Sequence, residues 1–184
     1  MINNCFEPLY NQKNKILTKW GKDQTGQIKY KINEQGFRSN FNYDFTPDYA
    51  FFGASVVFGI GVEFENIFAS QFQNSQNYGL AGSYMNEHSV KNFELFINSN
   101  LYKPNTKIVF CWVERDTEYI PDLYNHVQKY NHKNILHISL GQKYKGLCNL
   151  ISNVDNDISK THPGPKTHKI WAKCIKLLLN KQTL

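Results

Sequence analysis

Two short, uninterrupted apolar runs constrain this chain more than any other feature of its sequence. Residues 49–53 read Tyr-Ala-Phe-Phe-Gly, and residues 107–113 read Lys-Ile-Val-Phe-Cys-Trp-Val, which is apolar after its first residue. A run of this length without alternation is typical of a strand that is buried on both faces, and such strands occur in parallel sheets. The runs therefore predict a parallel sheet whose central strands are covered from both sides.

Helical patterns separate the predicted strands. Apolar residues recur at helical spacing over residues 65–73, 84–98, 120–130 and 167–180, and a further strand is expected over residues 134–138. Strands that alternate with helices form βαβ units, whose right-handed crossovers place helices on both faces of the sheet. We therefore expect an α/β fold, a three-layer α/β/α sandwich with a flavodoxin-like parallel sheet of about five strands.

The first part of the chain differs from the rest. Residues 1–48 are polar and rich in Asn and Gln, and only residues 28–32 alternate apolar and polar side chains, which predicts a short exposed strand. Because these residues contain too few apolar side chains for a core of their own, we expect an N-terminal extension that packs on one domain, residues 49–184. The total of 184 residues is sufficient for one such domain.

Composition limits the possible classes of protein. Hydrophobic residues make up 41% of the chain and charged residues 20%, which is typical of a globular protein. No apolar run approaches the ~20 residues that span a bilayer, and the N-terminus lacks a signal-peptide pattern. The four cysteines form no CxxC pair, so neither a zinc site nor a disulfide framework is expected. We expect a cytoplasmic or virion-associated protein without a metal or a cofactor.

The chain carries a formal net charge of +6. Its lysines are spread along the sequence, and no arginine-rich stripe with interleaved aromatic residues is present. We therefore interpret the positive charge as a solvated surface and do not expect a nucleic-acid partner.

Polar residues gather at the ends of the predicted strands. Ligands bind to parallel sheets beyond the carboxyl ends of the strands. Residues 53–55 (Gly-Ala-Ser) follow the first apolar run, residues 112–115 follow the second, and residues 77–79 belong to a glycine-punctuated loop after a very short strand. His162 lies on the loop that enters the last predicted helix, from which it can reach the same edge. We expect these segments to converge on one site.

The order of these segments resembles the SGNH (GDSL-type) hydrolases. Residues 52–62 (Phe-Gly-Ala-Ser-Val-Val-Phe-Gly-Ile-Gly-Val) are similar to the first block of that family, commonly written G-D-S-x-T-x-G-x-G, and residues 32–38 resemble a stretch that often precedes it. Residues 77–83 resemble the second block, and residues 161–164 (Thr-His-Pro-Gly) the last. The resemblance covers residues 32–180 and implies an SGNH hydrolase-like domain that cleaves a carboxylic ester, as an esterase or O-deacylase.

The resemblance also implies roles for individual residues. A serine hydroxyl becomes a good nucleophile only when a base removes its proton, so Ser55 is the candidate nucleophile and His162 the candidate base. The oxyanion of the intermediate needs preorganised donors, for which the backbone N–H groups of Ser55 and Gly79 are candidates. Arg115 is a candidate cationic donor where the family has an asparagine. Gly53 would permit the sharp turn before the nucleophile.

The substrate itself cannot be read from the sequence. We expect a small-molecule or glycan ester, in contact with Gly53, Asn77 and Trp112. His137 in a predicted strand is expected to be structural, and His168 to be structural or exposed to solvent. Oligomeric state is not predicted.

Three departures from the family pattern leave alternatives open. Ala54 replaces an aspartate of the first block, the third block lacks its asparagine, and Ser159 stands where the family has an aspartate three residues before His162. Asp157 or Asp155 could orient His162; otherwise the site is a Ser–His dyad. The alternative function is therefore a catalytically weak or inactive SGNH-fold protein that acts as a binding or particle-associated structural component.

A third interpretation is a flavodoxin-like or nucleotide-binding domain, because Gly59-Ile60-Gly61 follows a strand. Phe64 stands where the dinucleotide fingerprint requires its third glycine, so this interpretation ranks last.

Overall fold

The structure, a computed structural model, describes residues 12–81, 85–113, 120–130, 134–139, 149–150 and 152–181. In this part of the chain the main sheet contains β3 (Tyr49–Gly53), β4 (Ser75–Gly79), β5 (Lys107–Trp112), β6 (Ile135–Ser139) and β7 (Asn149–Leu150). The helices are α2 (Ser55–Phe58), α3 (Met85–Ile97), α4 (Ile120–Gln128) and α5 (Pro165–Lys181). A smaller antiparallel pair joins β1 (Ile16–Leu17) to β2 (Tyr30–Lys31).

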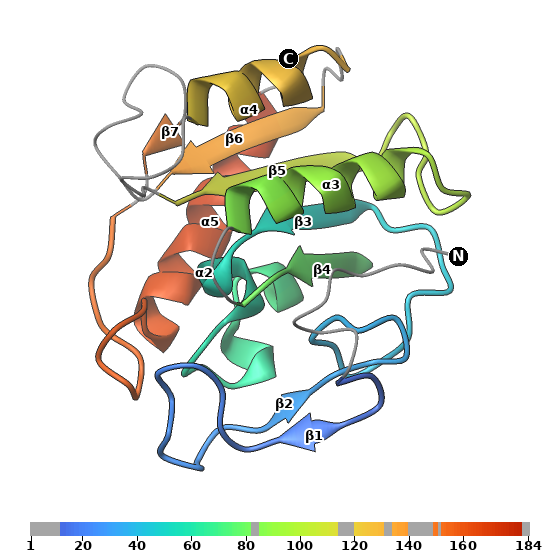
Figure 1. Cartoon of the computed structure of the whole chain (residues 1–184). Helices are drawn as coiled ribbons and strands as arrows, with labels where there is room; N and C mark the ends of the chain where they lie inside the picture. The colour runs from blue at the N-terminus through green and yellow to red at the C-terminus, as the bar shows by residue number, and fades with distance from the viewer. Residues whose placement is uncertain are drawn as a thin grey trace.

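The strands of the main sheet are ordered β4-β3-β5-β6-β7, and every neighbouring pair is parallel (Figure 1). This is the flavodoxin-like order, in which the chain leaves β3 toward one edge of the sheet and later returns on the other side of β3. The point of reversal lies between β3 and β5. Because α2 begins directly after β3, Ser55 stands at this switch point.

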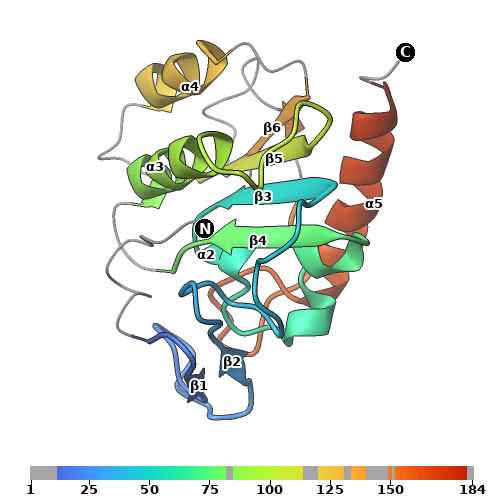
Figure 2. The same cartoon turned by 90° about the vertical axis from the view of Figure 1, so that its right-hand side faces the viewer.

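Helices cover both faces of the sheet. Figures 1 and 2 show α3 and α4 on one face and α5 on the other. The side chains of the central strands alternate accordingly: Phe52 and Phe110 belong to the core beneath α3, whereas Phe51 and Val109 belong to the core beneath α5. The expected α/β class and parallel sheet are confirmed, and the arrangement is compatible with three layers.

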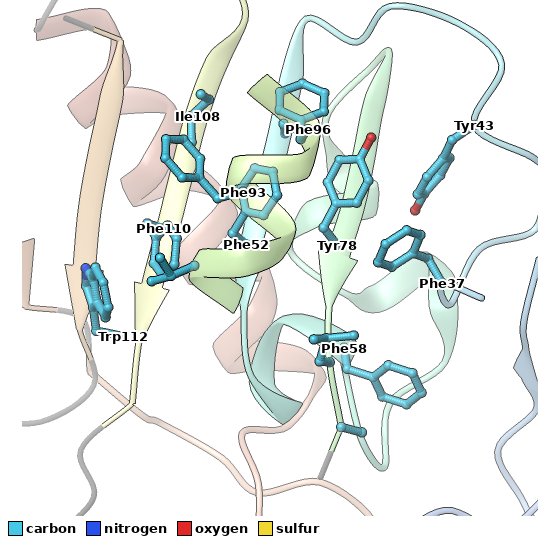
Figure 3. Packing of buried hydrophobic residues seen from close by; sticks show 14 of the residues in the cluster. Phe37, Tyr43, Phe52, Phe58, Tyr78, Phe93, Phe96, Ile108, Phe110 and Trp112 are labelled. Atoms are coloured by element: carbon cyan, nitrogen blue, oxygen red, sulfur yellow. The ribbon is translucent and has the colours of Figure 1, made fainter. Parts of the chain in front are cut away.

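Aromatic side chains dominate the core on the α3 face (Figure 3). Phe52 stacks on Tyr78 with ring centroids 4.9 Å apart, and Phe93 from α3 meets Phe52 edge to face. Phe37 and Tyr43, from the segment before β3, pack against Tyr78 in the same cluster. The described part of the N-terminal segment therefore shares a continuous core with the sheet.

Two local predictions differ from the structure. Residues 65–73 form two 3-10 turns, Phe64–Asn66 and Ala69–Gln71, instead of one helix. The hydroxyl of Ser70 donates to the carbonyls of Phe64 and Ile67, which also accept from the backbone N–H groups three residues further on, the pattern of 3-10 turns. The sequence predicts an exposed strand over residues 28–32, but only Tyr30–Lys31 is a strand. The apolar side chains of this stretch, Ile28, Tyr30 and Ile32, are buried.

The outer edge of β4 is occupied by a side chain. The phenolic oxygen of Tyr43 accepts a hydrogen bond from the N–H of Asn77 (2.8 Å) and donates one to its carbonyl (2.9 Å). The backbone of Asn77 is thus paired on the side that faces away from β3.

Candidate active site

Ser55 and His162 lie within hydrogen-bonding distance, although 107 positions separate them in the sequence. Ser55 Oγ is 2.9 Å from His162 Nε2. Ser55 is the first residue of α2, and His162 lies on the loop before α5. The serine retains 9% of its accessible surface and the imidazole 18% of its own, so the pair is largely buried but reachable. The predicted convergence of these two residues is what the structure shows.

Gly53 permits the sharp turn that brings the chain from β3 into α2. Its φ is +154°, which L-residues with a side chain rarely adopt. A β-carbon at this position would also overlap the carbonyl of Cys111 on the neighbouring strand and the side chain of Val57. Gly53 therefore sets the direction of α2. The atoms closest to it belong to Val57 and Cys111, whereas the sequence predicts a contact with substrate.

Asn77 and Gly79 fasten α2 to β4. Asn77 Nδ2 donates to the Val57 carbonyl (2.8 Å), and Oδ1 accepts from the Gly79 N–H (2.9 Å). A β-carbon on Gly79 would collide with the backbone of Val57 and Phe58, so only glycine permits this close approach. Both predicted site residues thus support α2, the helix that begins at Ser55. The Gly79 N–H, a predicted oxyanion donor, is paired with Asn77.

A carboxylate organises the loop that carries His162. Asp157 Oδ1 accepts hydrogen bonds from the backbone N–H groups of Thr161 (3.0 Å) and His162 (3.1 Å). The Asp157 N–H in turn donates to the carbonyl of His162 (2.7 Å). The Asp157 side chain is fully buried. Its Oδ2 lies 3.9 Å from His162 Nδ1, beyond the range of a direct hydrogen bond.

Two hydroxyl groups lie between Asp157 and the imidazole. Ser159 Oγ donates to Asp157 Oδ2 (2.7 Å) and is 2.6 Å from Thr161 Oγ1. Thr161 Oγ1 is 2.9 Å from His162 Nδ1. The position that holds an aspartate in the resembled family is therefore occupied by a hydroxyl that contacts the nearby carboxylate.

Asp155, the other carboxylate that the sequence offers as a partner of His162, contacts a different part of the chain. Its Oδ1 accepts from the Thr167 N–H (2.7 Å) and its Oδ2 from the Lys166 N–H (3.0 Å), in the first turn of α5. Burial alone would raise the pKa of this carboxyl, but the hydrogen bonds from Thr167 and Lys166 outweigh it and lower the pKa. Asp155 caps α5, which leaves Asp157 as the carboxylate beside His162.

A buried arginine supports the turn that follows α2. The Arg38 guanidinium donates to the carbonyls of Phe58 (3.2 Å) and Gly59 through one terminal nitrogen and to Val62 (2.7 Å) through the other. Arg38 is 1% exposed, and its charge lies 4.4 Å from the ring centroid of Tyr30. Burial lowers the pKa of Arg38 to about 10, so the side chain remains charged at neutral pH.

Tyr30, which lies against Arg38, contacts the same turn. Its hydroxyl accepts a hydrogen bond from the Gly61 N–H (2.8 Å) and donates to Asp23 Oδ2 (2.6 Å). The sequence-level reasoning assigned no role to Tyr30, Arg38 or Asp23. Two sequence signals pointed to Arg38: it ends residues 32–38, the stretch that resembles the segment before the family's first block, and it is one of two arginines in the chain.

Other predicted residues lie elsewhere. Trp112 is fully buried, and its indole N–H donates to His137 Nδ1 (2.9 Å), so the structure places it in the core beneath α3. Arg115 lies outside the described residues. Burial lowers the pKa values of His137 and His168 to about 4, and both side chains are structural.

An apolar pocket of about 350 Å³ opens beside the edge of β4. Its aromatic walls are Phe41, Tyr43, Phe45, Phe64 and Phe72. Asn77 lines this pocket, whereas Ser55 and His162 are not among its lining residues.

Within the described ranges, no group of three or more His, Cys, Asp or Glu side chains is arranged to hold a metal ion. The helices in the same part of the chain include none that is long and apolar enough to cross a membrane. No protein-family model, curated protein or solved structure matches this chain.

Proposed function

We propose that this protein is a serine hydrolase of the SGNH type that cleaves a carboxylic ester, as an esterase or O-deacylase. The observation that carries the proposal is the 2.9 Å separation of Ser55 Oγ and His162 Nε2 at the switch point of a parallel sheet. A nucleophile and a base within hydrogen-bonding distance are the minimal requirement for acyl transfer through serine. The order of the sequence blocks and the flavodoxin-like strand order agree with an SGNH-like three-layer domain.

The proposed reaction proceeds in two halves. Ser55 Oγ attacks the ester carbonyl carbon, and its proton passes to His162 Nε2. Collapse of the tetrahedral intermediate breaks the bond to the leaving alcohol, which takes the proton from the imidazolium. Water then attacks the acyl-enzyme with His162 as base, and the carboxylic acid leaves as Ser55 regains its proton. The cycle consumes one water and needs no cofactor.

The oxyanion of each intermediate requires donors near Ser55. The Ser55 N–H is at the first position of α2 and has no acceptor within the helix, so it is the primary candidate. The Gly79 N–H would contribute only if the Asn77 amide moved away from it. Arg115 remains a candidate on the sequence pattern alone. Loss of one oxyanion donor typically costs about 10²–10³ in rate.

A small-molecule or glycan ester is the proposed substrate class. The carboxylic acid and the alcohol would both be released.

A second candidate is a non-catalytic SGNH-fold protein that acts in binding or in a particle. It is favoured by Ala54, which offers no side-chain cap to α2, and by the paired state of the Gly79 N–H. The 2.9 Å separation of Ser55 Oγ and His162 Nε2 favours the catalytic candidate, because a serine nucleophile needs a base within reach.

A fluorophosphonate probe and a panel of short-chain nitrophenyl esters test the proposal. We expect the folded protein to be labelled at Ser55 and to hydrolyse at least one ester, and Ser55→Ala to do neither. His162→Gln should retain the fold and lose labelling, since the serine then has no base. Ser70→Ala is the matched control, because Ser70 also has a partly buried hydroxyl but is bonded to backbone carbonyls. Labelling that persists in Ser55→Ala, or wild-type protein that neither reacts nor hydrolyses, would leave the non-catalytic candidate.

A further inference from the structure

We propose that Thr161 and Ser159 are positioning residues, whose hydroxyl groups connect the Asp157 carboxylate to Nδ1 of His162. This inference rests on the proposed hydrolase function. In place of a direct contact between aspartate and histidine, a chain of three hydrogen bonds joins the two residues. This gives a role to Ser159, a departure from the family pattern, and to Thr161, which belongs to the stretch that resembles the last block.

The distances support a continuous chain. His162 Nδ1 to Thr161 Oγ1 is 2.9 Å, Thr161 Oγ1 to Ser159 Oγ is 2.6 Å, and Ser159 Oγ to Asp157 Oδ2 is 2.7 Å. Each is a normal hydrogen-bond length, whereas the direct separation of 3.9 Å from Nδ1 to Oδ2 is too long. These contacts thus connect the carboxylate to the imidazole through the two hydroxyls.

The chemistry of the end groups sets the direction of every bond. An ionised carboxylate only accepts, so the Ser159 hydroxyl donates to Asp157. Ser159 Oγ then accepts from the Thr161 hydroxyl, and Thr161 Oγ1 accepts from the Nδ1–H of His162. The neutral imidazole therefore carries its proton on Nδ1, which leaves the lone pair of Nε2 for the Ser55 hydroxyl.

The second oxygen of Asp157 keeps the chain in place. Oδ1 accepts from the backbone N–H groups of Thr161 and His162, so the residues at the imidazole end are fixed to the same carboxylate. Because the carboxylate is buried and Thr161 is exposed, the chain runs from the interior to the surface of the site.

No proton has to move along this chain during the reaction. Ser55 transfers its proton to Nε2, and the imidazolium that forms keeps its proton on Nδ1. The aligned hydroxyl dipoles, with the carboxylate behind them, stabilise that positive charge and hold the ring toward Ser55. The two hydroxyls position the base and do not contact the substrate.

The first measurement is the ¹⁵N NMR spectrum of the His162 ring in the unliganded protein, at a pH where the imidazole is neutral. We expect wild type and Thr161→Ser to show the Nδ1–H tautomer. Thr161→Val, which removes the acceptor with little change of shape, should shift the population toward Nε2–H. Thr18→Val, at an exposed threonine in the N-terminal segment, is the control. A wild-type ring protonated on Nε2, or a Thr161→Val spectrum identical to wild type, would overturn the proposal.

The second measurement is the rate of fluorophosphonate labelling at Ser55. Thr161→Val and Ser159→Ala should each slow labelling by about 2- to 10-fold, as expected for one net hydrogen bond, and Thr161→Ser should restore it. Equal rates in all variants would refute the chain while leaving the hydrolase intact. A wild-type protein that is never labelled would refute the hydrolase, and the NMR tautomer would still show whether the chain exists.

Discussion

Gly61 lies against the carboxylate of Asp157 so closely that a β-carbon on residue 61 would overlap Oδ2. The turn after α2 and the loop that carries His162 are therefore in direct contact. The Tyr30 hydroxyl accepts a hydrogen bond from the Gly61 N–H, and Arg38 donates to the carbonyls of Gly59 and Val62. The N-terminal segment therefore supports the turn that contacts Asp157.

This contact predicts a large effect of Gly61→Ala. Gly61 has a φ of +72°, so alanine adds backbone strain as well as the overlap with Asp157. We expect the variant to lose labelling at Ser55 and several kcal/mol of stability. Gly26→Ala is a matched control, because Gly26 has a φ of +76° with nothing within 4 Å of a β-carbon. Gly26→Ala should cost only about 1–2 kcal/mol in urea unfolding. Equal losses in both variants would mean that the Asp157 contact is unimportant.

The buried guanidinium predicts that Arg38 cannot be replaced by lysine. A single ammonium cannot reach the carbonyls of Phe58, Gly59 and Val62 with the geometry of a planar fork. Since hydrogen bonds to charged groups contribute about 1.5–3 kcal/mol each, Arg38→Lys should lower the free energy of unfolding by about 3 kcal/mol. Lys31→Met, at an exposed lysine bonded to one carbonyl, should change it by less than about 0.5 kcal/mol. Chemical denaturation monitored by tryptophan fluorescence measures both, and a small loss in Arg38→Lys would contradict the expected role.

Asn77 offers a separate test of how α2 is fastened. Asn77→Ala removes the partners of the Val57 carbonyl and of the Gly79 N–H, both buried. We expect a loss of about 2–3 kcal/mol in stability, because two polar groups become unsatisfied. Asn98→Ala, at an exposed amide bonded to one helix carbonyl, is the control and should be nearly neutral. A stable Asn77→Ala protein with faster labelling would show instead that the amide restricts Gly79 as an oxyanion donor.

The buried histidines predict that stability falls in mild acid. Burial lowers the pKa of His168 to about 4 from its usual 6.5, so the unfolded chain takes up a proton at a higher pH than the folded protein. The stability that depends on the neutral ring is complete above pH 6.5 and is lost as the pH falls toward 4. The gap corresponds to about 3 kcal/mol for His168. Urea unfolding between pH 7 and 4.5 should show a flatter dependence in His168→Gln than in wild type, and parallel curves would contradict the assignment.

The sequence predicts the central sheet well because its strands are uninterrupted and apolar. The runs at residues 49–53 and 107–113 correspond to β3 and β5. Ser55 follows the end of β3, and the loop before α5 brings His162 to the same edge of the sheet, as expected. These features depend on local pattern and on rules of chain topology that apply to most parallel sheets.

The remaining features depend on contacts that no local pattern records. Asp155 and Asp157 are two positions apart, and only the folded loop decides which carboxylate caps α5 and which meets His162. Trp112 ends an apolar strand, but its indole N–H donates to His137 in the core, so the side chain does not line the edge of the sheet where the site lies. Arg38 acts on backbone carbonyls, which every sequence possesses, so its partners could not be inferred.

The hydroxyl of Tyr43 has a consequence for the behaviour of the protein at high concentration. A free edge strand is a template onto which another chain can add, and such addition leads to aggregation. Since Tyr43 occupies both the N–H and the carbonyl of Asn77, the middle of β4 cannot recruit a foreign strand. The Tyr43 hydroxyl therefore protects this edge of the sheet from pairing with a strand of another copy of the chain.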